Sequence, residues 1–118
     1  MSWKFHSQAP IFKQIIDEMT FRIIRGDYKS GDKLGSVREL AVEAGVNPNT
    51  MQRALSEIEG TGLVVTLRGD GRYITEDAGL IRELRQSYIE DNTKAFLKKM
   101  LDLGFQKSEI SEIISKTD

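Results

Sequence analysis

The chain has 118 residues, of which 39% are hydrophobic and 30% are charged, and it contains no cysteine. This composition is typical of a soluble globular protein with one domain and a short appendage, and it excludes disulfides and thiolate metal sites. No apolar run approaches the roughly 18 residues of a membrane span, and the start of the chain does not resemble a signal peptide. We therefore expect no membrane segment and a cytoplasmic location.

The net charge of -1 and the isoelectric point near 5.9 argue mildly against a nucleic-acid partner, because domains that bind nucleic acid are usually basic. The charge is uneven along the chain. Residues 1–75 hold ten Lys and Arg against nine Asp and Glu, whereas residues 76–118 hold seven against nine. A prediction of DNA binding must therefore depend on where individual arginines lie.

The first predicted helix begins at Pro10 and is closed by Gly26. Its apolar residues recur at helical spacing and are expected to face the core. They are Ile11, Phe12, Ile15, Ile16, Met19, Ile23 and Ile24. Trp3 and Phe5 precede this helix and are expected to pack across it or against a neighbouring protomer. His6 is the single histidine and has no partners for a metal or catalytic site, so we expect it on the surface.

The next two predicted helices are short and are joined by a tight turn. Ser36 and Glu39 can form a capping box at the start of the first, and Gly45 ends it without steric cost. Asn47 then caps the second helix, and Pro48 takes its first position, where a missing N–H costs nothing. This arrangement predicts a helix-turn-helix.

The second of these helices divides its residues between two faces. The apolar stripe consists of Met51, Ala54, Leu55 and Ile58, and the outer face of Asn49, Thr50, Gln52, Arg53 and Glu57. Amides, a hydroxyl and a guanidinium can form hydrogen bonds with base edges, and a helix-turn-helix presents these first turns to the major groove. From this helix alone, an ordinary solvated face is an equally good interpretation.

A change of periodicity after Gly62 predicts a β-hairpin, with strands over residues 63–67 and 72–75. A hairpin in this place is a wing. Arg68 and Arg72 flank the glycine-rich turn at its tip, where their guanidiniums would meet a phosphate backbone or the minor groove.

The remaining residues predict a hinge over 76–79, a long helix that ends at Gly104 and a short helix over 107–115. The apolar stripe of the long helix consists of Ile81, Leu84, Tyr88, Ala95, Phe96, Met100 and Leu103. Asn92 interrupts this stripe and is expected to set the register of a dimer. Two such helices bury too little to be stable alone, which favours dimerisation. The alternative is that they fold back on their own N-terminal domain.

These motifs together resemble the winged-helix domain of GntR-family bacterial transcription regulators, over about the first two-thirds of the chain. The motifs are Pro10-Ile11-Phe12, Gln14-Ile15, Ile24-Arg25-Gly26, Gly31-Asp32-Lys33-Leu34, Ser36-Val37-Arg38-Glu39-Leu40-Ala41, Val46-Asn47, Thr50-Met51, Ala54-Leu55, Gly62-Leu63 and Gly69-Asp70-Gly71-Arg72-Tyr73. The tail is similar to that of the YtrA-type subgroup, in which two helices replace the large effector domain.

The resemblance implies contacts with double-stranded DNA from three places. They are Arg38 in the Ser-x-Arg-x-Leu-Ala motif, Pro48, Asn49, Thr50 and Gln52 on the recognition helix, and Arg68 and Gly69 at the wing tip. Ser36, Asn47, Arg53 and Arg72 complete the predicted DNA-binding set. Two positions depart from the family pattern: Gly35 replaces a usual proline, and Pro48 stands where arginine or a polar residue is frequent, so one contact is expected to differ.

We predict an α+β, mainly α fold. A winged helix-turn-helix with three helices and a hairpin wing occupies residues 1–75, and a helical dimerisation region occupies residues 76–118. The residues predicted to form the dimer are Ile81, Leu84, Tyr88, Asn92, Phe96, Met100 and Leu103.

The predicted function is that of a sequence-specific transcriptional regulator, a homodimeric repressor that binds an inverted-repeat operator. The alternative is a winged-helix protein-interaction module without DNA binding, which would suit the acidic isoelectric point. No nucleophile, base and orienting group can be assembled from these residue types, so we expect neither an enzyme nor a cofactor or metal site. The sequence does not identify a small-molecule effector.

Overall fold

The structure is a computed structural model that describes residues 3–67 and 69–118. Over these residues the chain forms five helices and one two-stranded hairpin, and it divides into two compact units, residues 1–82 and residues 83–118. The boundary lies inside the fourth helix, a few residues beyond the predicted end of the first domain. None of the helices in the described residues combines the length and apolar character that crossing a bilayer requires.

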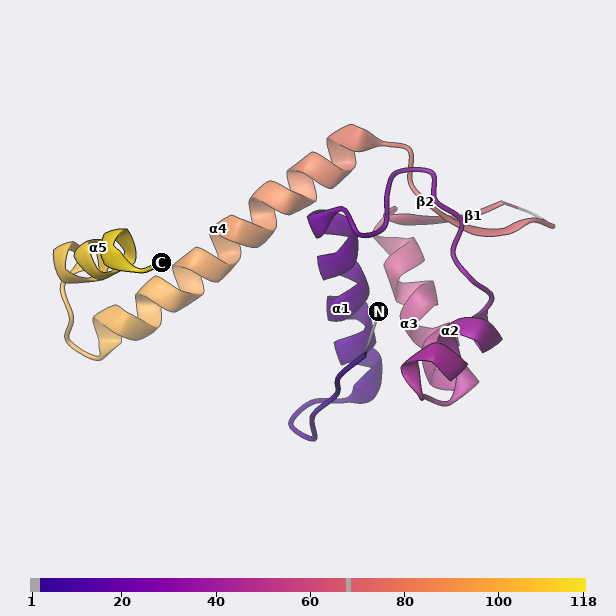
Figure 1. The fold of residues 1–118 in the computed structure, drawn as a ribbon, viewed down its shortest axis with the longest axis horizontal. Coiled ribbons are helices and arrows are strands. Elements are labelled where there is room, and N and C mark those ends of the chain that lie inside the picture. Colours follow the sequence, from indigo (N-terminus) through magenta and orange to yellow (C-terminus); the bar gives the residue numbers. More distant parts are fainter. Residues whose placement is uncertain (1–2, 68) are drawn as a thin grey trace. The chain divides into compact units, whose positions relative to one another are not determined.

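The N-terminal unit is a three-helix cluster with a hairpin, as predicted (Figure 1). Its helices are α1 (Ile11–Arg25), α2 (Val37–Ala44) and α3 (Pro48–Gly60). The antiparallel strands β1 (Val64–Leu67) and β2 (Gly71–Ile74) form the hairpin, with Val64 opposite Ile74. Lys33 forms an isolated bridge with Tyr73, so the segment before α2 also pairs with the wing.

The core of this unit lies between α1 and α3, with α2 and the base of the hairpin packed beside them. Its fully or almost fully buried apolar residues are Ile15, Met19, Ile23, Leu40, Ala41, Met51, Ala54, Leu55, Ile58, Leu63, Val64 and Ile74. Four of the seven α1 residues that were predicted to face the core are not fully buried. Phe12, Ile16 and Ile24 are half-buried, and Ile11 is 37% exposed, because it occupies the first position of α1 and lines a surface hollow.

The segment before α1 packs onto the N-terminal unit, as expected for its aromatic residues. The guanidinium carbon of Arg22 lies 4.2 Å from the centroid of the Trp3 ring, and Trp3 stacks on Phe5. Arg22 is itself 1% exposed and bonds to Glu18, whose side chain is 40% exposed, so Trp3 covers the buried guanidinium of this ion pair. His6 is exposed, and the described residues contain no group of three potential metal ligands.

The C-terminal unit consists of most of α4 (Ala78–Asp102) and α5 (Lys107–Lys116). Asp77 begins α4 by accepting a hydrogen bond from the backbone N–H of Leu80. Gly104 follows the end of α4 with φ 98°, a left-handed conformation that favours glycine. Gln106 precedes α5, and its N–H donates to Glu109.

The predicted capping box at the start of α2 is confirmed. The Ser36 Oγ accepts from the Glu39 N–H at 3.1 Å, and the Ser36 N–H donates to the Glu39 Oε1 at 3.0 Å. These bonds, together with nearby Lys33, lower the pKa of the Glu39 carboxyl. Both bonds satisfy N–H groups that the helix itself leaves without acceptors.

Ser36→Ala should lower the free energy of unfolding by about 1 kcal/mol, because the first turn of α2 loses its acceptor. Urea denaturation measures this loss. Comparing the wild type with Glu39→Gln tests how this contribution to folding stability depends on pH. The pKa of Glu39 is lower in the folded than in the unfolded protein, so its charge contributes fully to the free energy of unfolding above the unfolded pKa. This contribution is lost as the pH falls through the folded pKa, and the wild type and Glu39→Gln should then converge. A Ser36→Ala variant as stable as the wild type would contradict this account.

Candidate nucleic-acid interface

The outer face of α3 is the centre of the candidate interface. The buried stripe of α3 packs on the core and fixes its orientation, which leaves Asn49, Gln52 and Arg53 exposed and Thr50 half-buried. The Gln52 Nε2 donates to the Ser56 Oγ at 3.1 Å along this face. The predicted base-reading side chains therefore share one surface over the first turns of α3.

The residues that begin the two helices are used for capping. The Asn47 Oδ1 accepts from the Asn49 N–H at 2.7 Å, and Pro48 occupies the first position of α3. The Ser36 hydroxyl is likewise bonded within its capping box. The side-chain oxygens of Ser36 and Asn47 stabilise the starts of α2 and α3, and Ser36, Asn47 and Pro48 are all exposed.

The predicted arginines differ in how they are held. Arg38 is exposed on α2 and forms no ion pair with any residue that the structure describes. Arg53 is exposed and stacks on the ring of Phe12, with 3.7 Å between the guanidinium carbon and the ring centroid. Arg72 is half-buried and ion-paired with Glu59 of α3. Arg68 lies outside the described residues.

The wing tip is open and carries a small charged cluster. Gly69 has φ 82° with no atom within 4 Å of the position a Cβ would take, which leaves its backbone accessible. Beside it, the Tyr73 hydroxyl donates to Asp70, and the Lys33 Nζ lies 3.4 Å from the Asp70 Oδ1. These two partners lower the pKa of the Asp70 carboxyl, and the same bond from Tyr73 raises the pKa of the tyrosine.

The sequence did not predict the partners Phe12 and Glu59. Each lies far along the chain from the arginine that it contacts, on a different helix or strand, so no local spacing relates them. The sequence assigned Phe12 to the core only because its position fits the apolar stripe of α1.

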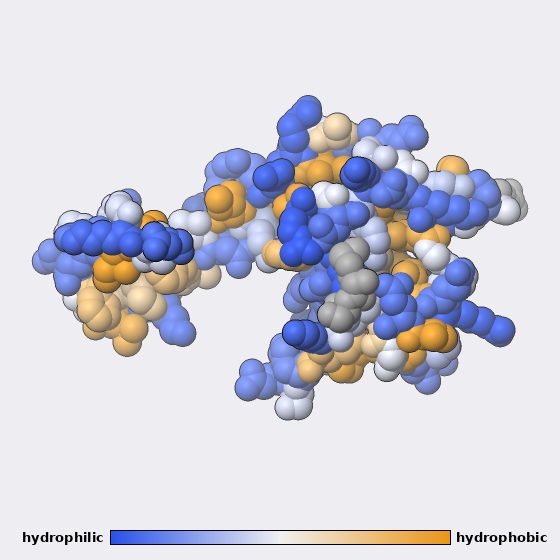
Figure 2. Space-filling model, viewed as in Figure 1, coloured by the Kyte–Doolittle hydropathy of each residue, from blue (hydrophilic) through white to orange (hydrophobic). Residues whose placement is uncertain are grey.

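The residues predicted for dimerisation lie in or next to the C-terminal unit, whose apolar surface is open (Figure 2). Ile81, Leu84 and Met100 are half-buried, whereas Tyr88, Phe96 and Leu103 are 41%, 46% and 65% exposed. Other large apolar residues here are exposed as well: Ile89, Leu101, Phe105, Ile113 and Ile114. Asn92 is bonded within its own helix, because its Nδ2 donates to the Tyr88 carbonyl at 2.8 Å.

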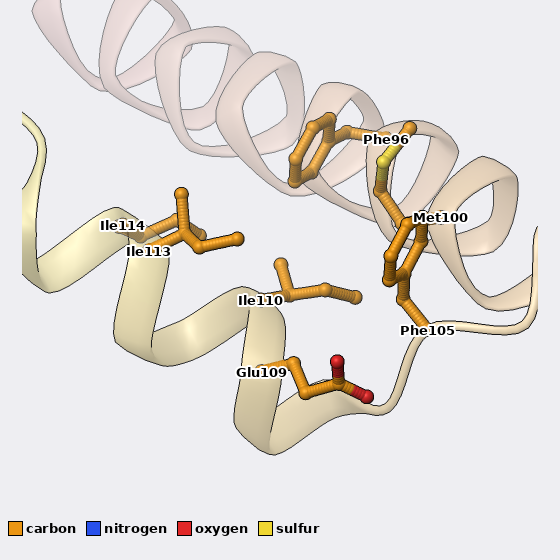
Figure 3. Close-up of a pocket in the computed structure, with 7 residues that line it drawn as sticks. All are labelled: Phe96, Met100, Phe105, Glu109, Ile110, Ile113 and Ile114. Atoms are coloured by element: carbon orange, nitrogen blue, oxygen red, sulfur yellow. The ribbon is translucent and has the colours of Figure 1, made fainter.

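A groove of about 230 Å³ lies between the end of α4 and α5 (Figure 3). Phe96 and Met100 of α4, Phe105 of the connecting loop and three isoleucines of α5 line it, with Glu109 contributing the single charged side chain. Ile110 is the one buried residue among residues 83–118. The unit thus leaves most of its apolar side chains without a partner.

Comparison with known proteins identifies relatives over almost the whole chain. Residues 12–74 match the profile of "Bacterial regulatory proteins, gntR family". The chain is 43% identical to the HTH-type transcriptional regulator YhcF of Bacillus subtilis, over 95% of this chain and 93% of that protein. It is 38% identical to the HTH-type transcriptional repressor YtrA of the same organism, over 93% of this chain and 85% of that protein.

A solved structure has the same fold over the full length. It is a GntR family transcriptional regulator from Listeria monocytogenes, with a TM-score of 0.92 and 41% sequence identity. The match covers 97% of this chain and 100% of that one. The likeness therefore includes the helices α4 and α5 and is not limited to the winged helix.

Arg72→Met should lower the free energy of unfolding by up to about 1 kcal/mol and leave the salt dependence of DNA binding unchanged, because Glu59 already holds the guanidinium. Glu59→Gln is the matched control, since it removes the same ion pair from the other partner. Chemical denaturation and DNA titration at several salt concentrations give both quantities. A salt slope that falls by about one unit in Arg72→Met would instead identify Arg72 as a phosphate contact.

Proposed function

Because the chain belongs to the gntR family of bacterial regulatory proteins, we propose that it is a repressor that binds an inverted-repeat operator as a homodimer. Regulation of transcription through DNA binding is the function of the family and of its close relatives, which are not enzymes. The DNA of a bacterium lies in the cytoplasm, so we propose that the protein acts there and has no catalytic role.

The observation that carries the proposal is the outer face of α3. The core holds this helix by one face, and the opposite face presents amide, hydroxyl and guanidinium groups over its first turns. Such groups distinguish base pairs in the major groove by their pattern of donors and acceptors. The hairpin that follows α3 would act as the wing and contact the DNA backbone next to the same groove.

We assign different roles to the residues of the interface. Asn49, Thr50 and Gln52 would read base edges. Arg38, Arg53, Arg68 and the backbone of Gly69 would bind phosphates and set the position of the helix, which carries no sequence information by itself. The remaining predicted residues would act indirectly: Ser36, Asn47 and Pro48 by shaping the helix starts, and Arg72 by holding the wing against α3.

The proposed homodimer would form through residues 76–118, with DNA binding assigned to residues 1–75. Two helices of this size cannot bury their apolar side chains on each other, and the exposed apolar side chains support a second copy of the chain as the partner. Two winged helices related by a two-fold axis would meet two half-sites of opposite orientation. This supports an inverted repeat as the operator.

Gln52→Ala and Arg38→Ala should weaken DNA binding in different ways. Loss of a base contact should cost about 1–3 kcal/mol on the preferred site and relax the preference at one position. Loss of a phosphate contact should weaken binding to all sequences and reduce the salt slope by about one unit. Selection from a random DNA pool, followed by titration at several salt concentrations, measures both effects. A Gln52→Ala variant that selects the wild-type sequence would show that the reading face is assigned wrongly.

Phe96→Asp should convert the dimer to a monomer, because a carboxylate would be desolvated in the interface. The monomer should lose tight binding to the full operator and keep weak binding to a half-site. Ser87→Asp is the control: it adds the same charge nine residues earlier, on the opposite side of α4, where it is exposed. Light scattering and DNA titration on both variants distinguish the outcomes. A Phe96→Asp variant that remains a dimer would contradict the assigned interface, and a monomeric variant that binds the full operator as tightly as the wild type would show that the tail has another function.

A further inference from the structure

A shallow hollow beside the start of α3 brings α1 into the candidate interface. Its volume is about 360 Å³, and Ile11, Phe12, Asn49, Thr50 and Arg53 line it. Two of its residues come from α1 and three from the first turns of α3. The hollow thus contains three residues of the predicted DNA-binding set and an aromatic residue that the set does not include.

Within this hollow the Arg53 guanidinium lies over an aromatic ring. Its carbon is 3.7 Å from the centroid of Phe12, closer than in the contacts that Arg22 and Arg25 make with rings. A stacked guanidinium uses its face for the ring and keeps its N–H groups, which lie in the plane, available to acceptors. The Phe12 ring therefore orients Arg53 without occupying its hydrogen-bond donors.

Three other arginines of the N-terminal unit are held by carboxylates rather than by a ring alone. Glu18, Asp27 and Glu59 form ion pairs with Arg22, Arg25 and Arg72 respectively. Arg53 has no carboxylate partner among the residues that the structure describes, so its charge is not neutralised within the protein. It is held by an apolar group instead, and its charge stays available to DNA.

We propose that Phe12 is a positioning residue for DNA binding, which holds the Arg53 guanidinium in the orientation that binds a backbone phosphate. This inference rests on the proposed function and adds a residue of α1 to the interface. A free arginine side chain loses rotamer entropy when it is fixed on a phosphate. Stacking on Phe12 fixes it before DNA arrives and so removes part of that cost.

The proposal predicts that substitutions of Arg53 and Phe12 both lower the affinity for DNA, but that only the substitution of Arg53 changes its salt dependence. Arg53→Gln removes a charge, so it should weaken binding and reduce the salt slope by about one unit. Phe12→Leu keeps the charge and removes only the ring, so it should weaken binding about two- to tenfold, the cost of immobilising one long side chain on binding, and leave the slope unchanged. Phe12→Tyr keeps a ring and should bind as the wild type does.

The test is a double-mutant cycle on the full chain, with the DNA sequence that the wild type selects from a random pool. The variants are Phe12→Leu, Arg53→Gln and their combination, with Phe12→Tyr as the rescue and thermal unfolding as the check on folding. The Phe12→Leu substitution should weaken binding in the wild-type background and have no effect in the Arg53→Gln background. Arg53→Lys, which keeps the charge and loses the planar stack, supplies a second variant on the surface.

Two results would overturn the proposal. In one, Phe12→Leu weakens binding by the same factor with and without Arg53, which would make its role merely structural. In the other, the Phe12→Tyr variant binds DNA as weakly as the Phe12→Leu variant, or the Arg53→Lys variant binds DNA as tightly as the wild type. Failure of the proposed function is distinct from these, because the wild-type chain would then select no DNA sequence at all.

Discussion

The packing of α3 against α1 is the constraint on which the rest of the interface depends. Met51, Ala54, Leu55 and Ile58 are fully buried, so α3 cannot rotate about its axis without exposing them. Burying such side chains contributes roughly 1.5–3 kcal/mol each for the larger ones, far more than any one polar contact on the outer face. The core therefore decides which residues of α3 face outward, and the caps at Asn47 and Gly45 decide where the helix starts.

Ion pairs with carboxylates distinguish some arginines of the N-terminal unit from the others. Glu18 and Glu59 each bind an arginine that is half-buried or buried, and these pairs stabilise contacts inside the unit. Among the described residues Arg38 has no ion pair, and Arg53 lies over an aromatic ring. The DNA contacts that we propose for these two guanidiniums would therefore not compete with a carboxylate of the protein, in a chain whose net charge is -1.

The sequence predicted what is determined locally and missed what depends on distant contacts. The capping box of Ser36 and Glu39, the proline at the start of α3 and the hairpin all follow from residues within a few positions of one another. The partners of Arg53 and Arg72 do not, because Phe12 and Glu59 reach them only after the helices have packed. Ile11 was misplaced for a related reason: spacing puts it on the apolar face of α1, but at that end of the helix the neighbouring residues of α3 are Asn49, Thr50 and Arg53, which line an open hollow with it.

The C-terminal unit differs in that its exposed apolar residues were identified from the sequence, whereas the partner that would cover them is our proposal. Asn92, the polar residue within the stripe, bonds to its own backbone through its Nδ2. Apolar packing would then hold two winged helices together, and tethering raises the effective concentration of the second by roughly 10²–10⁴ over free binding. In the proposed dimer this tether would raise the affinity for an operator without additional positive charge.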